Sequence, residues 1–181
     1  MRIIGGDWGG RRISPPTNMP HTRPTTDIAK EGLFNVIENN LDLEKCNTLD
    51  LFGGTGSISY ELASRGAKAL TIVEKDNAMF EFIKKTSGAL GMKNTKLVKM
   101  DVFRFLETTN EKFDFIFAGP PYALATIDDL PRMVFAKAVL NEDGWLVLEH
   151  TPRNDYKSFE GYRTERKYGT TIFSIFVNRP A

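Results

Sequence analysis

The sequence predicts an α/β protein of the Rossmann-like type, with a mostly parallel seven-stranded sheet that ends in a C-terminal antiparallel hairpin. From residue 48 onward, short β-rich runs alternate with segments of helical periodicity, which is typical of a parallel sheet with helices on both faces. Near the C-terminus, two alternating runs are separated by a single glycine, as in a hairpin. We expect residues 1–181 to form one domain, because this length suffices for one sizeable core.

The expected elements follow one another closely after residue 48. The strands are Thr48–Phe52, Ala69–Glu74, Lys96–Met100, Phe113–Ala118, Trp145–His150, Tyr162–Tyr168 and Thr170–Asn178, the last two flanking Gly169. The helices between them are Ser57–Arg65, Asn77–Leu90, Val102–Glu107 and Asp128–Val139. Gly91 follows the second of these helices as an expected C-cap, and Gly66 plays the same part after the first.

A further helix is expected ahead of the first strand. Thr25 or Thr26 can cap its N-terminus, and it runs to about Asn39. Its apolar residues come in pairs every four residues, so we expect one face to pack on the core: Ile28/Ala29, Leu33/Phe34 and Val36/Ile37. Before it, residues 1–24 are rich in Gly and Pro and carry arginines, which indicates a basic arm dominated by loops.

The net charge of +1 is unevenly distributed along the chain. Residues 1–30 and residues 151–181 each carry +3, whereas the residues between them carry −5. Two basic ends on an acidic middle suggest a polyanion-binding surface if the ends meet in space. Solvated tails of ordinary charge are the alternative.

Composition bounds the setting of the protein. Its 41% hydrophobic and 26% charged residues are ordinary for a soluble globular protein, and no apolar run approaches the roughly 18 residues of a membrane span. We expect no secretory leader, because the N-terminus shows no basic-then-apolar pattern, and the lone Cys46 fits a reducing compartment. With His21 and His150 it makes no ligand spacing, so we expect no metal. We expect a cytoplasmic monomer that does not bind membranes.

The stretch LDLFGGTGSISYE, residues 49–61, indicates a ligand-binding turn. Gly53, Gly54 and Gly56 lie between a strand and a helix, where glycines allow a sharp turn and a close approach to a ligand. The N–H groups at the helix start favour a negative group, such as the pyrophosphate of a dinucleotide or the carboxylate of S-adenosylmethionine (SAM). The spacing is neither G-x-G-x-x-G nor that of a Walker loop, and a plain strand-to-helix turn is the simplest alternative.

Acidic residues at successive strand ends favour SAM. Asp50 can accept a hydrogen bond from the α-ammonium group of SAM, whereas it would repel a dinucleotide phosphate. Glu74 lies about 20 residues beyond the glycines, where an acid commonly binds ribose hydroxyls. Asp101 can accept from an adenine amino group, with Val102 or Phe103 against the purine, although a lone Asp at a strand end is usually a helix cap.

The stretch FDFIFAGPPYAL, residues 113–124, indicates a second site at the end of the fourth strand. Pro120 and Pro121 stiffen the loop and leave the carbonyls of Gly119 and Pro120 free of local N–H donors. Tyr122 offers an aromatic face on which an extruded base can stack. Such a site suits methylation of an exocyclic amine, a poor nucleophile whose N–H groups must be held by acceptors. A bland turn at the strand end is the alternative.

With these motifs in place, the chain resembles the bacterial methyltransferases that use SAM to modify the exocyclic amino group of a guanine in 16S rRNA. The resemblance runs nearly end to end and rests on MRIIGGDWGGRRI, RPTTDIAKEGLFN, LDLFGGTGSISYELASRGA, VEKD, FDFIFAGPPY and LVLEH. It implies a SAM-dependent methyltransferase fold that acts on 16S rRNA of the small ribosomal subunit. It implies cofactor binding by Asp50, Phe52, Gly53, Gly54, Gly56, Glu74, Lys75, Asp101 and Val102, and catalysis by Gly119, Pro120, Pro121 and Tyr122.

The resemblance also assigns roles to the N-terminal segment. Thr25 and Thr26, with Arg23, would close over the cofactor site, and Arg11, Arg12 and Arg23 would bind the RNA. The arm before Thr25 has little apolar content, so we expect it to order on RNA.

The chain departs from the family at Gly119, where the family carries Asp or Asn before the two prolines. Losing one preorganised partner of this kind reduces a rate by on the order of 10²–10³. Three outcomes are open: the enzyme is slow, water or another acid replaces the missing acceptor, or the chain binds RNA and SAM without efficient methylation. Asp114, within the strand, is a solvent-facing or capping residue rather than a substitute.

Three functions therefore compete. The first is a SAM-dependent methyltransferase that acts on a guanine amino group in 16S rRNA. The second is an RNA-binding protein of the same fold whose catalysis is impaired by Gly119. The third, a nicotinamide-dependent oxidoreductase, requires a dinucleotide glycine spacing that the chain lacks.

Overall fold

The computed structural model describes residues 1–17 and 24–179. Its strands are β1 (Asn47–Asp50), β2 (Ala69–Val73), β3 (Thr95–Val98), β4 (Phe113–Ala118), β5 (Leu140–His150), β6 (Tyr162–Tyr168) and β7 (Thr171–Val177). Its α-helices are α1 (Asp27–Asn40), α2 (Ser57–Ser64), α3 (Asn77–Leu90), α4 (Val102–Thr108) and α5 (Asp129–Ala136), and a short 3-10 helix spans Leu43–Lys45.

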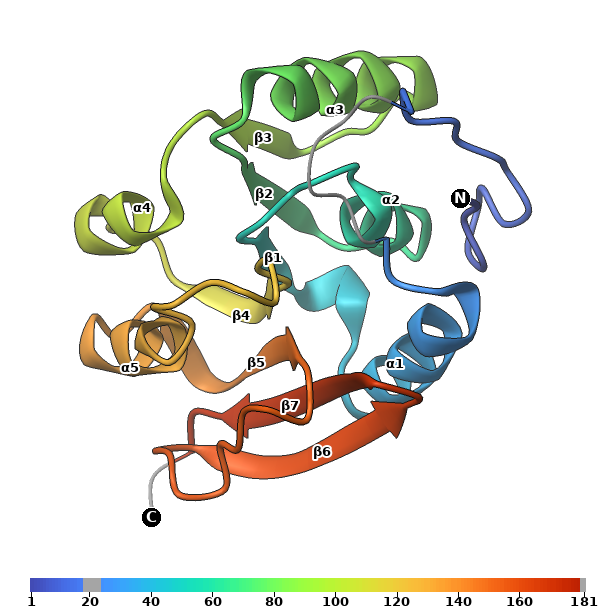
Figure 1. Ribbon diagram of the computed structural model, residues 1–181. Helices are drawn as coiled ribbons and strands as arrows, with labels where there is room; N and C mark the ends of the chain where they lie inside the picture. Colours follow the sequence, from blue (N-terminus) through green and yellow to red (C-terminus); the bar gives the residue numbers. More distant parts are fainter. Residues whose placement is uncertain (18–23, 180–181) are drawn as a thin grey trace.

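The seven strands form one sheet in the order β3-β2-β1-β4-β5-β7-β6 (Figure 1). The first five strands pair in parallel, and β7 pairs antiparallel with both β5 and β6. The predicted mostly parallel sheet with a C-terminal antiparallel hairpin is therefore confirmed. The hairpin joins the sheet through its second strand, so β6 is left at the edge.

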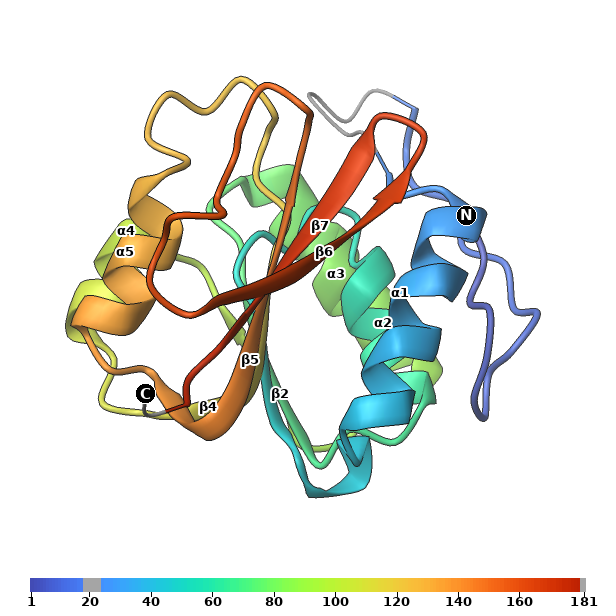
Figure 2. The same ribbon diagram turned by 90° about the horizontal axis from the view of Figure 1, so that it is seen from below.

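Helices cover both faces of the sheet (Figure 2). Each face has its own apolar core. On one face, α4 and α5 pack on a cluster that includes Val102, Phe113 and Leu130. On the other, α1, α2 and α3 pack on a cluster that includes Phe34 and Phe117. Because successive strand residues alternate between the faces, β4 and β5 contribute to both clusters.

Helix α1 buries one face as expected, with two differences. Ala29, Leu33 and Ile37 are fully buried, but Ile28 is 76% exposed. Lys30, which the helical pattern did not place on the buried face, is instead buried, with 1% of its surface exposed. The ammonium group of Lys30 donates to the Arg2 carbonyl at 2.6 Å and lies 3.5 Å from a carboxylate oxygen of Glu61. A buried lysine is thus stabilised by partners from other parts of the chain, which helical periodicity does not reveal.

Two other elements differ from the prediction by three or more residues at one end, and the remaining boundaries differ by two residues or fewer. Strand β5 begins at Leu140, five residues before the predicted start, after a register shift between Phe113 and Phe115 of β4. Helix α5 ends at Ala136 rather than at residue 139, because Ala138 has a φ of 52° and turns the chain out of the helix. Glycine usually marks this left-handed position, and its absence hid the helix end.

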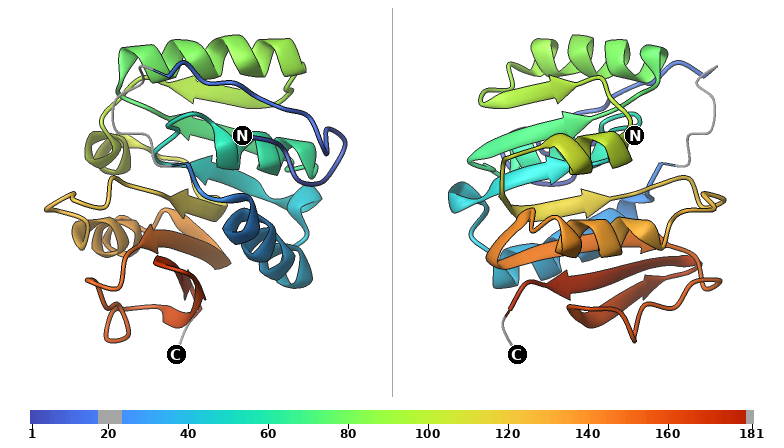
Figure 3. Two further views of the ribbon diagram at one scale, coloured as in Figure 1. Left: turned by 45° about the vertical axis from the view of Figure 1, so that its right-hand side comes forward. Right: turned by 90° about the vertical axis from the view of Figure 1, so that its left-hand side faces the viewer.

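Residues 1–17 of the N-terminal arm pack on the rest of the protein, a packing that the expectation of an arm that orders on RNA did not include. The arm runs along α2 (Figure 3), and Ile3 and Ile13 pack with Tyr60 and Leu90 in a small apolar cluster. The backbone N–H groups of Ile4 and Gly5 each donate to the Glu61 carboxylate at 2.9 Å. A buried carboxylate therefore anchors the arm to the core, and the low apolar content of the arm gave no indication of this.

Candidate active site

Polar residues gather where the five parallel strands end, at one edge of the sheet. The loops that follow β4 and β5 lie together at this edge (Figure 2). Strand order reverses between β1 and β4, and ligands of open α/β sheets bind at such a switch point. In the spatial order β3, β2, β1, β4 and β5, the strands end on or near Asp101, Glu74, Asp50, Gly119 and Glu149. Four of these five positions are carboxylates, and the exception is Gly119.

Asp50, at the end of β1, is 1% exposed. Its Oδ2 accepts a 2.7 Å hydrogen bond from the Ser59 hydroxyl, whereas Oδ1 is buried with no hydrogen-bond partner among the described residues. Burial raises the pKa of Asp50 to about 7, and repulsion from Glu74 and Glu149 adds to this, whereas the Ser59 hydroxyl and the nearby Phe52 N–H lower it. A buried carboxylate oxygen without a donor is unfavourable, so an ammonium group placed here would both pair with it and lower its pKa.

The glycine turn has two kinds of glycine. A Cβ on Gly53 would lie 2.8 Å from methyl groups of Ile72 and Ile83, and one on Gly56 would lie 2.2 Å from the Tyr60 ring, so both positions exclude side chains for packing reasons. Gly54 has a φ of 57°, and the single contact of a Cβ there would be a carbonyl oxygen 3.9 Å away. The turn is therefore open at Gly54, which is where a ligand can approach the backbone.

Glu74, directly after β2, holds the turn in place. Its Oε1 accepts from the Gly54 N–H and its Oε2 from the Asp76 N–H, both at 2.8 Å. Its neighbour Lys75 is exposed, and Phe52, at the start of the turn, is half-buried. Glu74 thus lies beside the open glycine, and the predicted ribose role requires a lone pair in addition to those used by the two amides.

Asp101 caps α4, the alternative that the sequence left open. Its Oδ2 accepts from the N–H groups of Phe103 and Arg104 at 3.0 and 3.2 Å, and its side chain is exposed at the sheet edge. Val102 is buried in the core, whereas Phe103 is half-buried. Of the two apolar candidates for a purine contact, Phe103 is the more accessible.

The loop after β4 carries Gly119 and the two prolines to the same edge. Pro120 is buried, Pro121 is exposed, and the Pro121 carbonyl accepts from the Leu124 N–H at 3.0 Å to turn the chain. Tyr122 is half-buried, and its hydroxyl donates to Oε2 of Glu149 at 2.7 Å. The hydroxyl end of the tyrosine is thereby fixed on β5, which orients the ring.

Glu149, in β5, is a site residue that the sequence reasoning missed. It is 5% exposed, and it also accepts a 2.7 Å hydrogen bond from the Thr25 hydroxyl through Oε1. Its signal in the sequence is a carboxylate that interrupts the apolar run WLVLEH near the end of a strand. Thr26 is the N-cap of α1 and accepts from the Ala29 N–H at 3.2 Å. The segment ahead of α1 thus reaches the site through Thr25.

The structure describes two of the three arginines that were predicted to bind RNA. Arg11 and Arg12 are exposed on the arm, and Arg12 pairs with Arg2 across a β-bridge. Arg23 lies outside the described residues. Asp114 accepts hydrogen bonds from the Asn47 N–H at 2.8 Å and from the Asn141 side chain at 2.9 Å. These contacts link β4 to β1 and β5 near the starts of the strands, at the edge of the sheet opposite the glycine turn. Asp114 is therefore no substitute for the acceptor missing at Gly119.

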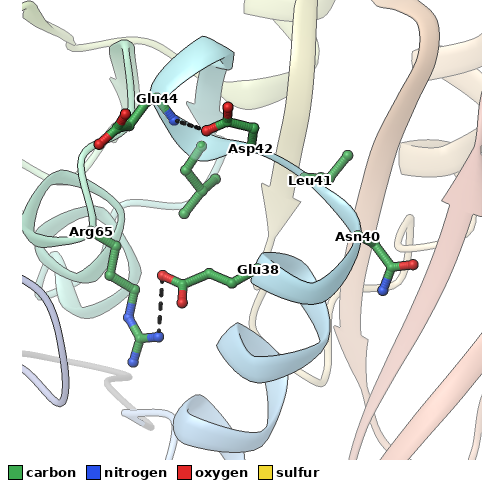
Figure 4. A pocket seen from close by; sticks show the side chains of 7 residues that line it. Glu38, Asn40, Leu41, Asp42, Glu44 and Arg65 are labelled. Atoms are coloured by element: carbon green, nitrogen blue, oxygen red, sulfur yellow. Dashed lines mark hydrogen bonds and ion pairs between the residues drawn. The ribbon is translucent and has the colours of Figure 1, made fainter.

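A surface pocket of about 400 Å³ lies elsewhere, between the end of α1 and the end of α2 (Figure 4). Its lining includes Glu38, which pairs with Arg65 at 3.4 Å, and it lies near the start of β1, away from the glycine turn. Within the parts of the chain that are described, no cluster of three potential metal ligands occurs. The helices in those parts are too short or too polar to cross a membrane.

The fold is that of the SAM-dependent methyltransferases. A solved structure described as the putative methyltransferase yhhF of Escherichia coli is similar over 100% of this chain and 99% of its own, with a TM-score of 0.86 and 24% identity. A 16S rRNA methyltransferase of Thermus thermophilus (RsmC), solved in complex with AdoMet and guanosine, is similar over 86% of this chain and 44% of its own, with a TM-score of 0.68 and 24% identity.

The sequence model of one family, described as Conserved hypothetical protein 95, matches residues 1–177, and the chain belongs to this family. Ribosomal RNA small subunit methyltransferase D of Escherichia coli is 32% identical over 149 residues, which cover 82% of this chain and 71% of the relative. Putative rRNA methyltransferase YlbH of Bacillus subtilis is 30% identical over 99% of this chain and 100% of its own length. The resemblance seen in the motifs is confirmed.

Proposed function

We propose that this chain transfers a methyl group from SAM to the exocyclic amino group of a guanine in 16S rRNA of the small ribosomal subunit, and that it does so in the cytoplasm as a monomer. The names of its relatives support the rRNA substrate. The observation that carries the proposal is the buried Oδ1 of Asp50, which has no hydrogen-bond partner in the described parts of the chain and lies one strand away from the Gly-Pro-Pro-Tyr loop. Asp50 pairs in register with Phe117, two residues before Gly119.

The residues present fit the cofactor. Asp50 would hold the ammonium group, the open backbone at Gly54 would face the ligand, and Glu74 and Asp101 would receive the ribose and the adenine. When bound, SAM supplies a methyl group on a sulfonium centre. The protein would hold the two reactants in line and accept hydrogen bonds from the N–H groups of the target amine.

The two basic ends of the chain are proposed to contact the RNA. They approach each other around α1: Arg2 of the arm pairs with Asp27 at 2.9 Å, and Gly32 lies against the Tyr168 ring of β6. Arg163, Arg166 and Lys167 of β6 are exposed, as are Arg11 and Arg12. Such an arrangement supports a polyanion-binding surface over solvated tails, because both ends flank α1. The start of this helix reaches the site through the hydrogen bond of Thr25 to Glu149.

The test is methyl transfer to small subunits from cells that lack this enzyme, measured with labelled SAM and followed by digestion of the RNA to nucleosides. We expect label in a guanosine methylated on its exocyclic amine. Calorimetry with S-adenosylhomocysteine and with NAD in parallel should show binding of the former alone. Absence of both transfer and S-adenosylhomocysteine binding contradicts the proposal. Binding without transfer would instead support the RNA-binding alternative, which nothing in the comparisons favours.

A further inference from the structure

We propose that Glu149 is the residue that accepts the hydrogen bond and then the proton of the target amine, in the place of a side chain that Gly119 cannot provide. The inference rests on the proposed function and names a catalytic residue for it. An amine that gains a methyl group needs an acceptor beside it, and Gly119 offers none beyond its backbone.

The pairing of β4 with β5 places Glu149 beside Gly119. Ala118 and Leu148 are partners in the parallel register, so the next residues along the two strands are Gly119 and Glu149. Side chains alternate between the faces of a sheet, so Glu149 lies on the face of Val147 and a side chain at position 119 would lie on the face of Phe117. These two apolar residues belong to the same core cluster. The carboxylate of Glu149 therefore lies on the face toward which a side chain at position 119 would point.

The contacts of Glu149 are those of a functional carboxylate rather than a structural one. It is 5% exposed, and the Thr25 and Tyr122 hydroxyls each donate one 2.7 Å hydrogen bond, to different oxygens. Among the described residues, no lysine or arginine pairs with it. A buried carboxylate without a cation is costly, and each oxygen retains a lone pair for a further donor.

The loop that is proposed to bind the base is joined directly to this carboxylate. Tyr122, whose ring is the proposed stacking surface, is tied to Glu149 through its hydroxyl. Asp50 on β1, the residue proposed to hold the ammonium group of SAM, is near enough for its pKa to be raised by the charge of Glu149. Glu149 on β5 and Asp50 on β1 thus flank β4, the strand that carries the proposed base-binding loop.

The proposed step balances as follows. The nitrogen lone pair forms the new bond to the methyl carbon, and the electron pair of the broken carbon–sulfur bond stays with sulfur, which becomes a neutral thioether. The amine nitrogen then carries one proton too many, and this proton passes to a carboxylate oxygen of Glu149. Release of that proton to water returns Glu149 to its ionised form.

Glu149→Gln tests the inference, with Glu142→Gln as the matched control, because Glu142 is an exposed glutamate on the same strand. We expect Glu149→Gln to lower kcat by about 10²-fold or more while the affinity for S-adenosylhomocysteine stays within about twofold. Glu142→Gln should match the wild type. A kcat of Glu149→Gln within about threefold of wild type overturns the inference and leaves the proposed function standing, whereas a wild type without transfer removes both.

A second measurement does not depend on turnover. Guanosine and inosine differ by the exocyclic amine, so each is titrated into protein saturated with S-adenosylhomocysteine. We expect the wild type and Glu142→Gln to prefer guanosine by about tenfold, and Glu149→Gln to lose most of that preference. An unchanged preference overturns the inference. If Glu149→Gln does not fold, Glu149→Asp is measured instead: withdrawal of the carboxylate by one methylene should lower kcat at least tenfold, and an unchanged kcat overturns the inference.

Discussion

The Ser59 hydroxyl and the Asp50 carboxylate are joined by a 2.7 Å hydrogen bond that uses one carboxylate oxygen, and residues 1–17 and 24–179 supply no hydrogen-bond donor to the other, buried oxygen. Ser59 belongs to α2, the helix that follows the glycine turn, so the bond fixes the aspartate relative to that turn. The fold maintains the unfavourable burial of this oxygen, which a positively charged group would relieve.

Asp50→Asn is therefore expected to weaken the binding of S-adenosylhomocysteine by about 10- to 100-fold, the range for loss of a charge-assisted hydrogen bond. The same change should leave the fold intact, because the amide can still accept from Ser59. Isothermal titration calorimetry and circular dichroism measure the two properties. Asp42→Asn, at an exposed aspartate far from the turn, is the control and should bind like the wild type.

The stability contributed by Asp50 should fall as the pH rises. Its pKa is about 7 in the folded protein and 3.8 without burial, so between these values the native state holds a proton that the unfolded chain has released. Stability from this group is thus greatest below pH 4 and declines up to pH 7. The free energy of unfolding of Asp50→Asn minus that of the wild type should therefore be larger at pH 8 than at pH 5. Urea titrations of both proteins at the two pH values measure this difference. A pH-independent difference contradicts the shift.

Ligand binding should follow the opposite trend with pH. The ammonium group of the ligand pairs with ionised Asp50, and the ionised fraction of a carboxyl with a pKa of about 7 rises roughly tenfold between pH 6 and pH 8. We expect the affinity for S-adenosylhomocysteine to rise by about the same factor over this range. Asp50→Asn, which has no proton to lose, should show a nearly flat profile by calorimetry.

The sheet could be predicted because each of its signals is local. The ends of β4 and β6 and both ends of α3 agree with the prediction, since alternation, helical spacing and the cap at Gly91 are written in neighbouring residues. The early start of β5 could not be found in this way. It depends on a register shift against β4, a partner that lies more than 20 residues away.

The site was predictable in part for the same reason. Asp50 ends a strand and Gly54 and Glu74 follow strands, and the structure brings the three together at the switch point. Glu149 and Glu61 were missed, because each acts through residues remote in sequence. Thr25 lies 124 residues from Glu149, and Ile4 lies 57 residues from Glu61. A local sequence pattern does not reveal either of these long-range contacts.

Glu61 is expected to hold the N-terminal arm on α2. It is fully buried and accepts from two arm amides, and Arg65 donates to it at 2.8 Å. Glu61→Gln removes the charge opposite Lys30 and Arg65, so the free energy of unfolding should fall by about 3–5 kcal/mol, the range for breaking a buried ion pair. Trypsin should then cleave after Arg11 and Arg12 faster than in the wild type.

The control for this prediction is Glu38→Gln. Glu38 contacts the same Arg65 at 3.4 Å, but its side chain is 45% exposed. Its loss should change the free energy of unfolding by about 1 kcal/mol or less, and the arm should stay protected from trypsin. Equal effects of the two substitutions would show that the buried network does not anchor the arm.

Gly119→Asp is expected to give no gain in rate, although it restores the carboxylate that the family resemblance leads one to look for. A Cβ at Gly119 would lie 2.8 Å from the Phe117 ring, which is buried against Phe173. The substitution should lower the free energy of unfolding by about 1–3 kcal/mol through overpacking. Gly119→Ala adds the same Cβ without the charge and should be similarly destabilised. Because Glu149 already supplies an acceptor on that face, kcat should not exceed the wild-type value in either variant. A rise of tenfold or more in Gly119→Asp alone would mean that the wild type lacks its acceptor.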